Sequence, residues 1–115
     1  MYQKGTHHAD KLQHIQLPVF DGDKCQSIYS YTKTTQLNQT TQLCVGGLEG
    51  KDSCNGDSGS SLMTRRSLNT RIWPVTWKLI GLVSFGPRTC GLERVPGVYT
   101  KVRPYIDWIL DNVRN

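Results

Sequence analysis

Residues 46–61 read GGLEGKDSCNGDSGSS, and this glycine-rich stretch is the most informative part of the chain. No regular element tolerates so many glycines, so we expect an irregular loop whose backbone N–H groups face a ligand. Within it, Ser58 stands between Asp57 and Gly59, and Gly56 precedes them. Small neighbours leave a serine oxygen accessible and let N–H groups point at a developing oxyanion. The tetrapeptide GDSG also suits an ordinary turn, and taken alone it favours the turn.

Short apolar runs on both sides of this loop predict a protein of strands and turns. The run KLIGLVSF at residues 78–85 is almost continuously apolar, which is typical of a strand buried on both faces. Alternation predicts further strands at residues 97–102 and 14–20, with a short one at 43–45. Pro18 has no N–H for a ladder, so its position belongs at an edge or a bulge. The pattern is that of an all-β domain.

Two segments have helical character. Asp caps allow one or two helical turns within residues 21–31. A C-terminal helix is predicted over residues 104–115, where Pro104 suits the first turn. Its apolar residues recur at helical spacing: Tyr105, Ile106, Ile109, Leu110 and Val113. We expect the polar stretches 32–42 and 64–73 to be loops, and Phe85 and Trp108 to be packing groups.

Size, charge and composition exclude several classes of protein. A chain of 115 residues is one domain or less. Lys and Arg number 14 against 9 Asp and Glu, a net charge of +5, and apart from the dibasic Arg65-Arg66 the basic residues are scattered singly. Nucleic acid is therefore not expected as a partner. No apolar run is long enough to span a membrane, and the polar N-terminus lacks the apolar core of a signal peptide.

The cysteines indicate an oxidising compartment. Cys25, Cys44, Cys54 and Cys90 are widely spaced and even in number, which fits two disulfides with three possible pairings. Asn38 opens the glycosylation sequon NQT, which has meaning only in a secretory compartment. Together these signals favour an extracellular protein.

The histidines do not predict a metal site. His7, His8 and His14 have no Asp, Glu or Cys at ligand spacing, so we expect them on the surface. Neither a metal nor another cofactor is expected.

Several ordered motifs change the interpretation of the GDSG loop. KDSCNGDSG is followed by SFG at residues 84–86, by Cys90 and by PGVYT at residues 96–100. The chain thereby resembles the trypsin-like (chymotrypsin-family) serine proteases from about Asp10 to Val113, and its end looks especially like arthropod clip-domain proteases. The resemblance implies an all-β fold, the second six-stranded barrel of the chymotrypsin-like double β-barrel, incomplete at its N-terminal edge and closed by an α-helix. Residues 1–11 would be an irregular segment and residues 12–113 a partial peptidase domain.

The resemblance also implies roles for individual residues. Ser58 would be the nucleophile, and the N–H groups of Gly56 and Ser58 would form the oxyanion hole. Asp52 would lie at the floor of the specificity pocket, where a carboxylate favours Arg or Lys. Gly86 and Gly97 would form the pocket walls. Without the resemblance, Asp52 beside Lys51 would be taken for a solvated charge, and the two glycines for turn residues.

Further implied roles concern the loops around this pocket. Residues Ser84, Phe85 and Gly86 would pair with the substrate backbone as a strand. Asp57 would accept the new amino terminus that zymogen cleavage creates. The implied disulfides are Cys25–Cys44 and Cys54–Cys90, each typically contributing about 2–4 kcal/mol. The implied partners are protein substrates with Arg or Lys at the cleavage site, together with serpin-type inhibitors and other proteases of an extracellular cascade.

The sequence departs from the family pattern in its missing catalytic base. Family members hold their histidine in an alanine-alanine-histidine-cysteine context and their aspartate in the first barrel, and neither motif occurs in these 115 residues. We therefore expect a chain that corresponds to the C-terminal half of a protease domain and is inactive alone. Ser60-Ser61 also replaces the usual glycine-proline, and a positive φ at Ser60 would be costly.

Three functions fit these observations. The first is a trypsin-like serine endopeptidase represented by an incomplete chain. The second is a non-catalytic protease homologue that acts as a binding partner in a protease cascade. Retention of Ser58 and Asp52 favours the first over the second. The third, a small disulfide-stapled secreted binding module, leaves the ordered motifs unexplained.

Overall fold

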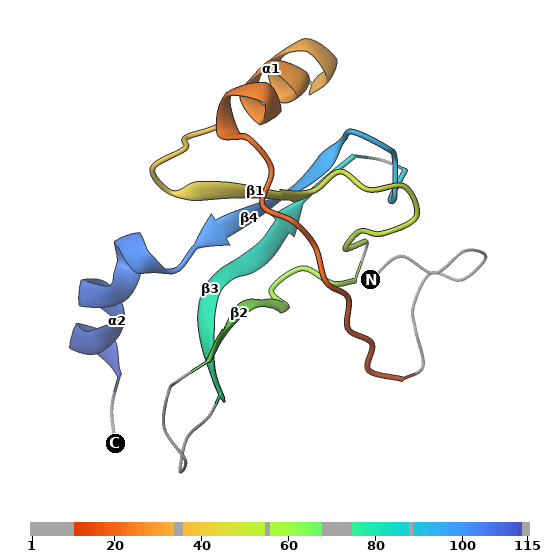
Figure 1. The fold of residues 1–115 in the computed structure, drawn as a ribbon. Coiled ribbons are helices and arrows are strands. Elements are labelled where there is room, and N and C mark those ends of the chain that lie inside the picture. Colours follow the sequence, from red (N-terminus) through yellow and green to blue (C-terminus); the bar gives the residue numbers. More distant parts are fainter. Residues whose placement is uncertain (1–10, 34–35, 55, 68–74, 88, 114–115) are drawn as a thin grey trace.

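A computed structural model of the chain describes residues 11–33, 36–54, 56–67, 75–87 and 89–113. Four antiparallel strands form one sheet in the order β1-β4-β3-β2, and the sheet curls like part of a barrel wall (Figure 1). The elements in chain order are α1 (Gly22–Lys33), β1 (Gln42–Gly46), β2 (Ser61–Ser67), β3 (Val75–Phe85), β4 (Pro96–Lys101), the 3-10 turn η1 (Arg103–Tyr105) and α2 (Ile106–Asn112). The all-β class with a C-terminal helix is confirmed, with four strands of the six-stranded barrel among the described residues.

The core lies where α1 packs against the β1–β4 end of the sheet. Its buried members are Cys25, Tyr29, Leu37, Cys44 and Val98, and Phe20, Ile28 and Phe85 pack against them. Helix α1 is longer than the one or two turns expected from the sequence. Asp21 accepts a hydrogen bond from the Lys24 N–H (2.9 Å) at its start, and the burial of Tyr29 holds its later turns on the sheet.

Strand β3 corrects the expectation of a strand buried on both faces. Only Gly81 of its eleven residues is buried, whereas Trp77, Leu79 and Leu82 are exposed. These three side chains share one face of β3, where among the described residues Phe85 at the strand end packs against the core. A continuous apolar run indicates that both faces of a strand can be buried, but it does not identify the segments that bury them.

Other segments also differ from their predictions. Residues 64–67 belong to β2 and are not a loop, because they pair with residues 75–78 of β3; residues 68–73 lie outside the described residues. The predicted strand at residues 14–20 is reduced to one bridge, Val19 to Val45. Its Pro18 carbonyl accepts a hydrogen bond from the Gly46 N–H (2.8 Å) at the sheet edge, where a proline is tolerated.

The C-terminal helix is shorter than predicted. It begins after η1, which contains Pro104, and ends at Asn112. Trp108, expected to be a packing group, is 66% exposed in the described part of the chain, whereas Phe85 packs as expected. Among those residues, no helix is long and apolar enough to cross a membrane.

Candidate active site

The loop before β2 presents Ser58 on the surface. Asp57 shapes it, because its side-chain Oδ2 accepts the Cys54 N–H (2.8 Å) while its own N–H donates to the Cys54 carbonyl (2.9 Å). The Gly59 N–H then donates to the Val83 carbonyl (2.9 Å), which ties the loop to β3. Ser58 stands at the tip of this turn with its side chain exposed.

Glycine is required on both sides of Ser58. Gly56 has a φ of 94° and Gly59 a φ of 84°, a left-handed region that other residues rarely adopt. Ser60 is not among the described residues with positive φ, so the departure from the family pattern at this position carries no backbone strain. Within the described residues, the N–H groups of Gly56 and Ser58 have no acceptor, which leaves both available to an oxyanion.

A buried carboxylate lies close to this loop. Asp52 is only 3% exposed, and its Oδ2 accepts a hydrogen bond from the Gly91 N–H (3.1 Å). Burial raises the pKa of the Asp52 carboxyl above its ordinary value near 3.8, and the N–H groups of Gly91 and Ser53 partly oppose the rise. It is therefore no solvated surface charge, and a buried anion of this kind favours a cationic ligand.

Two glycines stand beside this carboxylate. A Cβ on Gly97 would lie 3.3 Å from Oδ1 of Asp52 and 3.3 Å from Cε1 of Tyr99. A Cβ on Gly86 would lie 3.8 Å from the Gly97 Cα, so the two glycines face each other. The structure thus brings Asp52, Gly86 and Gly97 together from the loop after β1, the end of β3 and the start of β4.

Two further residues, Tyr99 and Tyr29, complete the surroundings, and no role was assigned to either from the sequence. Tyr99 is buried and donates its hydroxyl hydrogen to Oγ of Ser53 (3.2 Å). Tyr29 donates to the Pro96 carbonyl (2.6 Å), and its ring meets Phe85 edge-on with centroids 5.6 Å apart. Burial, followed by the nearby Asp52 charge, raises the pKa of Tyr29. The alternating pattern of residues 97–102 could have indicated that Tyr99 is buried. The short helix predicted within residues 21–31 contained no comparable indication that Tyr29 is buried.

The end of β3 extends past the last partner that β2 supplies. β2 pairs with β3 as far as Leu82, and the register between β3 and β4 shifts between Val83 and Phe85. Ser84 is the extra residue at this bulge and is exposed, next to the loop that carries Ser58. A strand end of this kind can accept an added strand.

Two disulfides hold the loops in place. Cys25–Cys44 joins α1 to β1, and Cys54–Cys90 joins the Ser58 loop to the segment whose Gly91 binds Asp52. These are the pairings that the resemblance implied. Asn38 lies in an exposed turn between α1 and β1, where its Oδ1 accepts the Thr40 N–H (2.9 Å).

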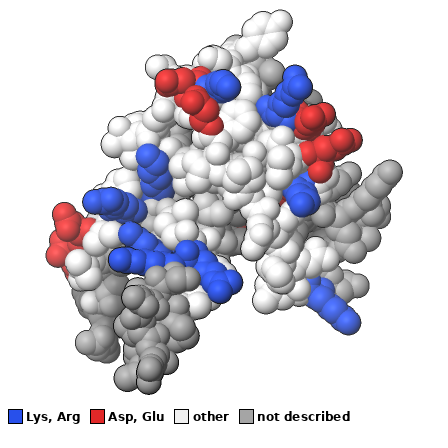
Figure 2. All heavy atoms as spheres, viewed as in Figure 1, with Lys and Arg blue, Asp and Glu red and all other residues white. Residues whose placement is uncertain are grey.

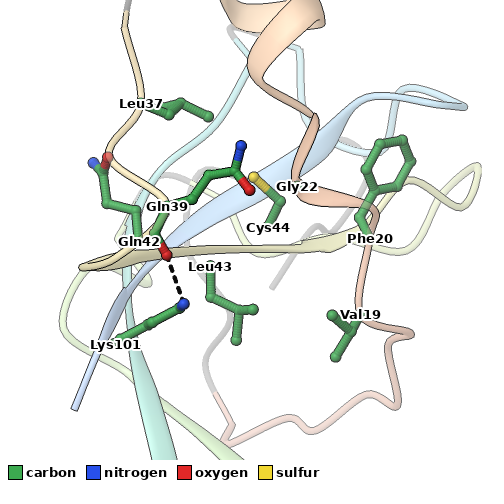
Figure 3. Close-up of a pocket in the computed structure, with 9 residues that line it drawn as sticks. All are labelled: Val19, Phe20, Gly22, Leu37, Gln39, Gln42, Leu43, Cys44 and Lys101. Atoms are coloured by element: carbon green, nitrogen blue, oxygen red, sulfur yellow. Dashed lines mark hydrogen bonds between the residues drawn. The ribbon is translucent and has the colours of Figure 1, made fainter. Parts of the chain in front are cut away.

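A hollow of about 200 Å³ lies away from this site, between α1, β1 and residues 19–20 (Figure 3). Lys101 lines it and donates its ammonium hydrogen to the Gln39 carbonyl (2.6 Å). Among the described residues that line the hollow, none is a nucleophile or a carboxylate. Within the described residues there is also no group of three potential metal ligands, and His14 is exposed; His7 and His8 lie outside those residues.

Comparison with known proteins gives one consistent answer. The family model described as Trypsin matches residues 1–109. CLIP domain-containing serine protease B15 of Anopheles gambiae is 45% identical over 101 residues, 88% of this chain and 25% of the relative. Serine protease ea of Drosophila melanogaster is 46% identical over 93 residues, 81% of this chain and 22% of the relative. Phenoloxidase-activating factor 3 of Holotrichia diomphalia is 39% identical over 106 residues, which are 92% of this chain and 28% of the relative. The chain spans about a quarter of the length of these curated relatives.

Proposed function

Because the chain belongs to the trypsin family, we propose that it carries the nucleophile and the specificity pocket of a serine endopeptidase that cleaves proteins after Arg or Lys. The observation that carries the proposal is the buried Asp52 beside two facing glycines. A side chain at either position would narrow the space in front of the carboxylate, whereas glycine leaves it open. Because the space is open, a long cationic side chain of a substrate could reach Asp52 and form a charge-assisted hydrogen bond with it.

In the proposed reaction, the Ser58 oxygen attacks the scissile carbonyl. The N–H groups of Gly56 and Ser58 stabilise the resulting oxyanion, a contribution of about 10²–10³ in rate per donor where it has been measured. The serine proton must pass to a base and then to the leaving amine. These 115 residues have no histidine in the family's catalytic context, so we expect them to achieve no protease-like turnover without a base from elsewhere.

The pocket assignment is tested by Asp52→Ser in the protease that contains this segment and a complete catalytic triad. Loss of the buried carboxylate should reduce kcat/KM for Arg and Lys substrates by at least about 10²-fold, because their cations lose their partner. Peptides with Leu or Phe at the cleavage position should be affected much less. Glu49→Ser, which removes an exposed carboxylate three residues away, is the matched control. An unchanged preference for Arg and Lys in the Asp52 variant would refute the assignment.

The second candidate function is a non-catalytic protease homologue in an extracellular cascade, and retention of Ser58 and Asp52 disfavours it. A fluorophosphonate probe separates the two. The 115-residue chain should label at Ser58 far more slowly than a complete trypsin-like protease, because its hydroxyl stays protonated. If the protease containing this segment also fails to label with its triad intact, the non-catalytic function is the correct one. Labelling of the isolated chain at protease-like rates would contradict the need for an external base.

Both functions place the protein outside the cell. Two disulfides support an oxidising compartment. Protein substrates, serpin-type inhibitors and other proteases of the cascade are the proposed partners, and Asp57 is proposed to receive a newly cleaved amino terminus.

Secretion should also place a glycan on the exposed Asn38. Glycosidase treatment of the secreted protein should therefore lower its mass, and Asn38→Gln should abolish that change.

A further inference from the structure

Basic side chains that are scattered along the sequence come together on the sheet. Arg66 of β2, Lys78 of β3 and Lys101 of β4 lie on three neighbouring strands, and Arg103 follows directly in η1. We call these four residues the basic face. In Figure 2 the Lys and Arg side chains gather over this part of the sheet and η1. The sequence alone indicated a chain without basic clusters.

The register puts three of these cations on the same side of the sheet. Lys101 pairs with Gly81, Gly81 pairs with Leu62, and paired residues share a face. Alternation along β2 puts Thr64 and Arg66 on the Leu62 face, and Thr64 pairs with Lys78. The register shift between Leu62 and Met63 makes Ile80 an extra residue of β3. Without that bulge, Lys78 would point away from Lys101.

The charge and exposure of the basic face favour the binding of an anion. Arg66 and Lys78 are diagonal neighbours, which stand roughly 7–8 Å apart on adjacent strands, and both are exposed. Among the described residues, no ion pair involves any of the four cations. Lys101 spends one hydrogen on the Gln39 carbonyl and keeps two donors. The hydroxyls of Thr64 and Thr76 lie on the same side as further donors.

We propose that the basic face binds a sulfated polysaccharide. An open row of cations across three strands fits an extended polymer with repeated negative charges. Single-stranded nucleic acid fits less well, because it needs exposed aromatic rings to stack on. The exposed Trp77 pairs with Arg65 and so lies on the opposite side of the sheet. The choice of a sulfated polymer rests on the extracellular location given under the proposed function.

The basic face is separate from the candidate active site. The Ser58 loop joins β2 at Ser61, and Arg66 lies five residues further, roughly 17 Å along the strand at about 3.3 Å per residue. A polymer held there leaves the space beside Asp52 open. The binding also needs neither a nucleophile nor a base, so it is measured independently of protease activity.

The test uses heparin as the probe and the full oxidised chain, with both disulfides verified by peptide mapping. Arg66→Ser with Lys78→Ser removes two cations of the basic face. The matched control, Lys11→Ser with Lys24→Ser, removes two exposed lysines elsewhere. Affinity for immobilised heparin is measured at several salt concentrations, together with circular dichroism of each variant.

The unchanged chain and the control should elute from heparin at nearly the same salt concentration, and the basic-face variant well before them. Its affinity at about 0.1 M salt should fall by roughly tenfold or more, and its slope of log K against log salt should decrease by about two, one for each cation removed. An equal loss in the control would overturn the proposal, because net charge alone would then explain binding. Equal binding of desulfated heparin would also overturn the proposal. So would displacement of the chain from immobilised heparin by duplex DNA at a lower concentration of negative charges than soluble heparin requires.

Discussion

Asp52 illustrates how one buried residue can be unfavourable for folding and favourable for binding. Its carboxylate gives up water, and the two N–H donors from Gly91 and Ser53 replace only part of that hydration, so burial raises its pKa. A native state that holds this proton more tightly than the unfolded state loses stability as the pH rises. A cationic ligand would offset this loss of stability, because it would pair with the ionised Asp52 carboxylate.

The first prediction concerns this pH dependence. Between about pH 4 and pH 7 the free energy of unfolding of the unchanged chain should fall relative to that of Asp52→Asn, because the amide cannot ionise and still accepts the Gly91 N–H. Urea unfolding at several pH values measures the difference. The exposed Glu93→Gln should follow the unchanged chain. A difference between the chain and Asp52→Asn that stays constant with pH would show that Asp52 does not titrate with a raised pKa.

At the scale of elements, helix α1 supports the site without contributing a reacting group. Tyr29 reaches from α1 to the Pro96 carbonyl, next to Gly97, and its ring contacts Phe85, next to Gly86. The helix therefore braces the segments of β3 and β4 that lie beside Asp52. The Cys25–Cys44 disulfide joins the same helix to β1, which borders β4 on the side away from β3.

The second prediction separates the hydroxyl of Tyr29 from its ring. Tyr29→Phe keeps the contact with Phe85 and removes the hydrogen bond to Pro96. The free energy of unfolding should fall by about 1–2 kcal/mol, because a buried carbonyl loses its partner. Tyr31→Phe makes the same change on the same helix at a side chain that is 91% exposed, and should alter stability by less than about 0.5 kcal/mol. Equal effects of the two substitutions in urea unfolding would argue against the brace.

At the scale of the whole molecule, a large share of the apolar side chains remains on the surface. Trp77 and Leu79 are exposed on β3, and Trp108 and Leu110 are exposed on α2. Exposed apolar area of this extent promotes association. Trp77 and Leu79 also lie opposite the basic face, so the two sides of the sheet offer different kinds of surface there.

The third prediction follows from this exposure. The oxidised chain should self-associate, because exposed apolar patches form contacts between molecules. Trp77→Lys with Leu79→Lys should raise the dissociation constant by about tenfold or more, as measured by analytical ultracentrifugation. Gln13→Lys with Gln36→Lys adds the same charge at exposed polar positions and should have a much smaller effect. A chain that stays monomeric throughout would show that the exposed side chains do not drive association.

Prediction from the sequence succeeded where the signal was local or carried by an ordered motif. The predicted strand at residues 43–45 lies within β1, and the one at residues 97–102 matches β4 except for Val102, because alternation and flanking glycines act over a few residues. It failed for residues 64–67, which are polar and pair as a strand because β3 lies alongside them. Tyr29 was missed because its acceptor lies 67 residues away in the chain.

The sequence by itself determined the residue types that the proposed chemistry needs: a serine in a glycine-rich loop, an acidic residue six positions before it, and cysteines for two disulfides. Residue types and short spacings encode such features directly. Cysteine spacing left three pairings open, the family resemblance implied the pairing that the structure has, and only the tertiary structure decided that Asp52 is buried beside Gly86 and Gly97 and that Arg66, Lys78 and Lys101 share one face. The physical reason is that burial and facing depend on strand register, and a single extra residue at Ile80 sets the side on which a cation lies.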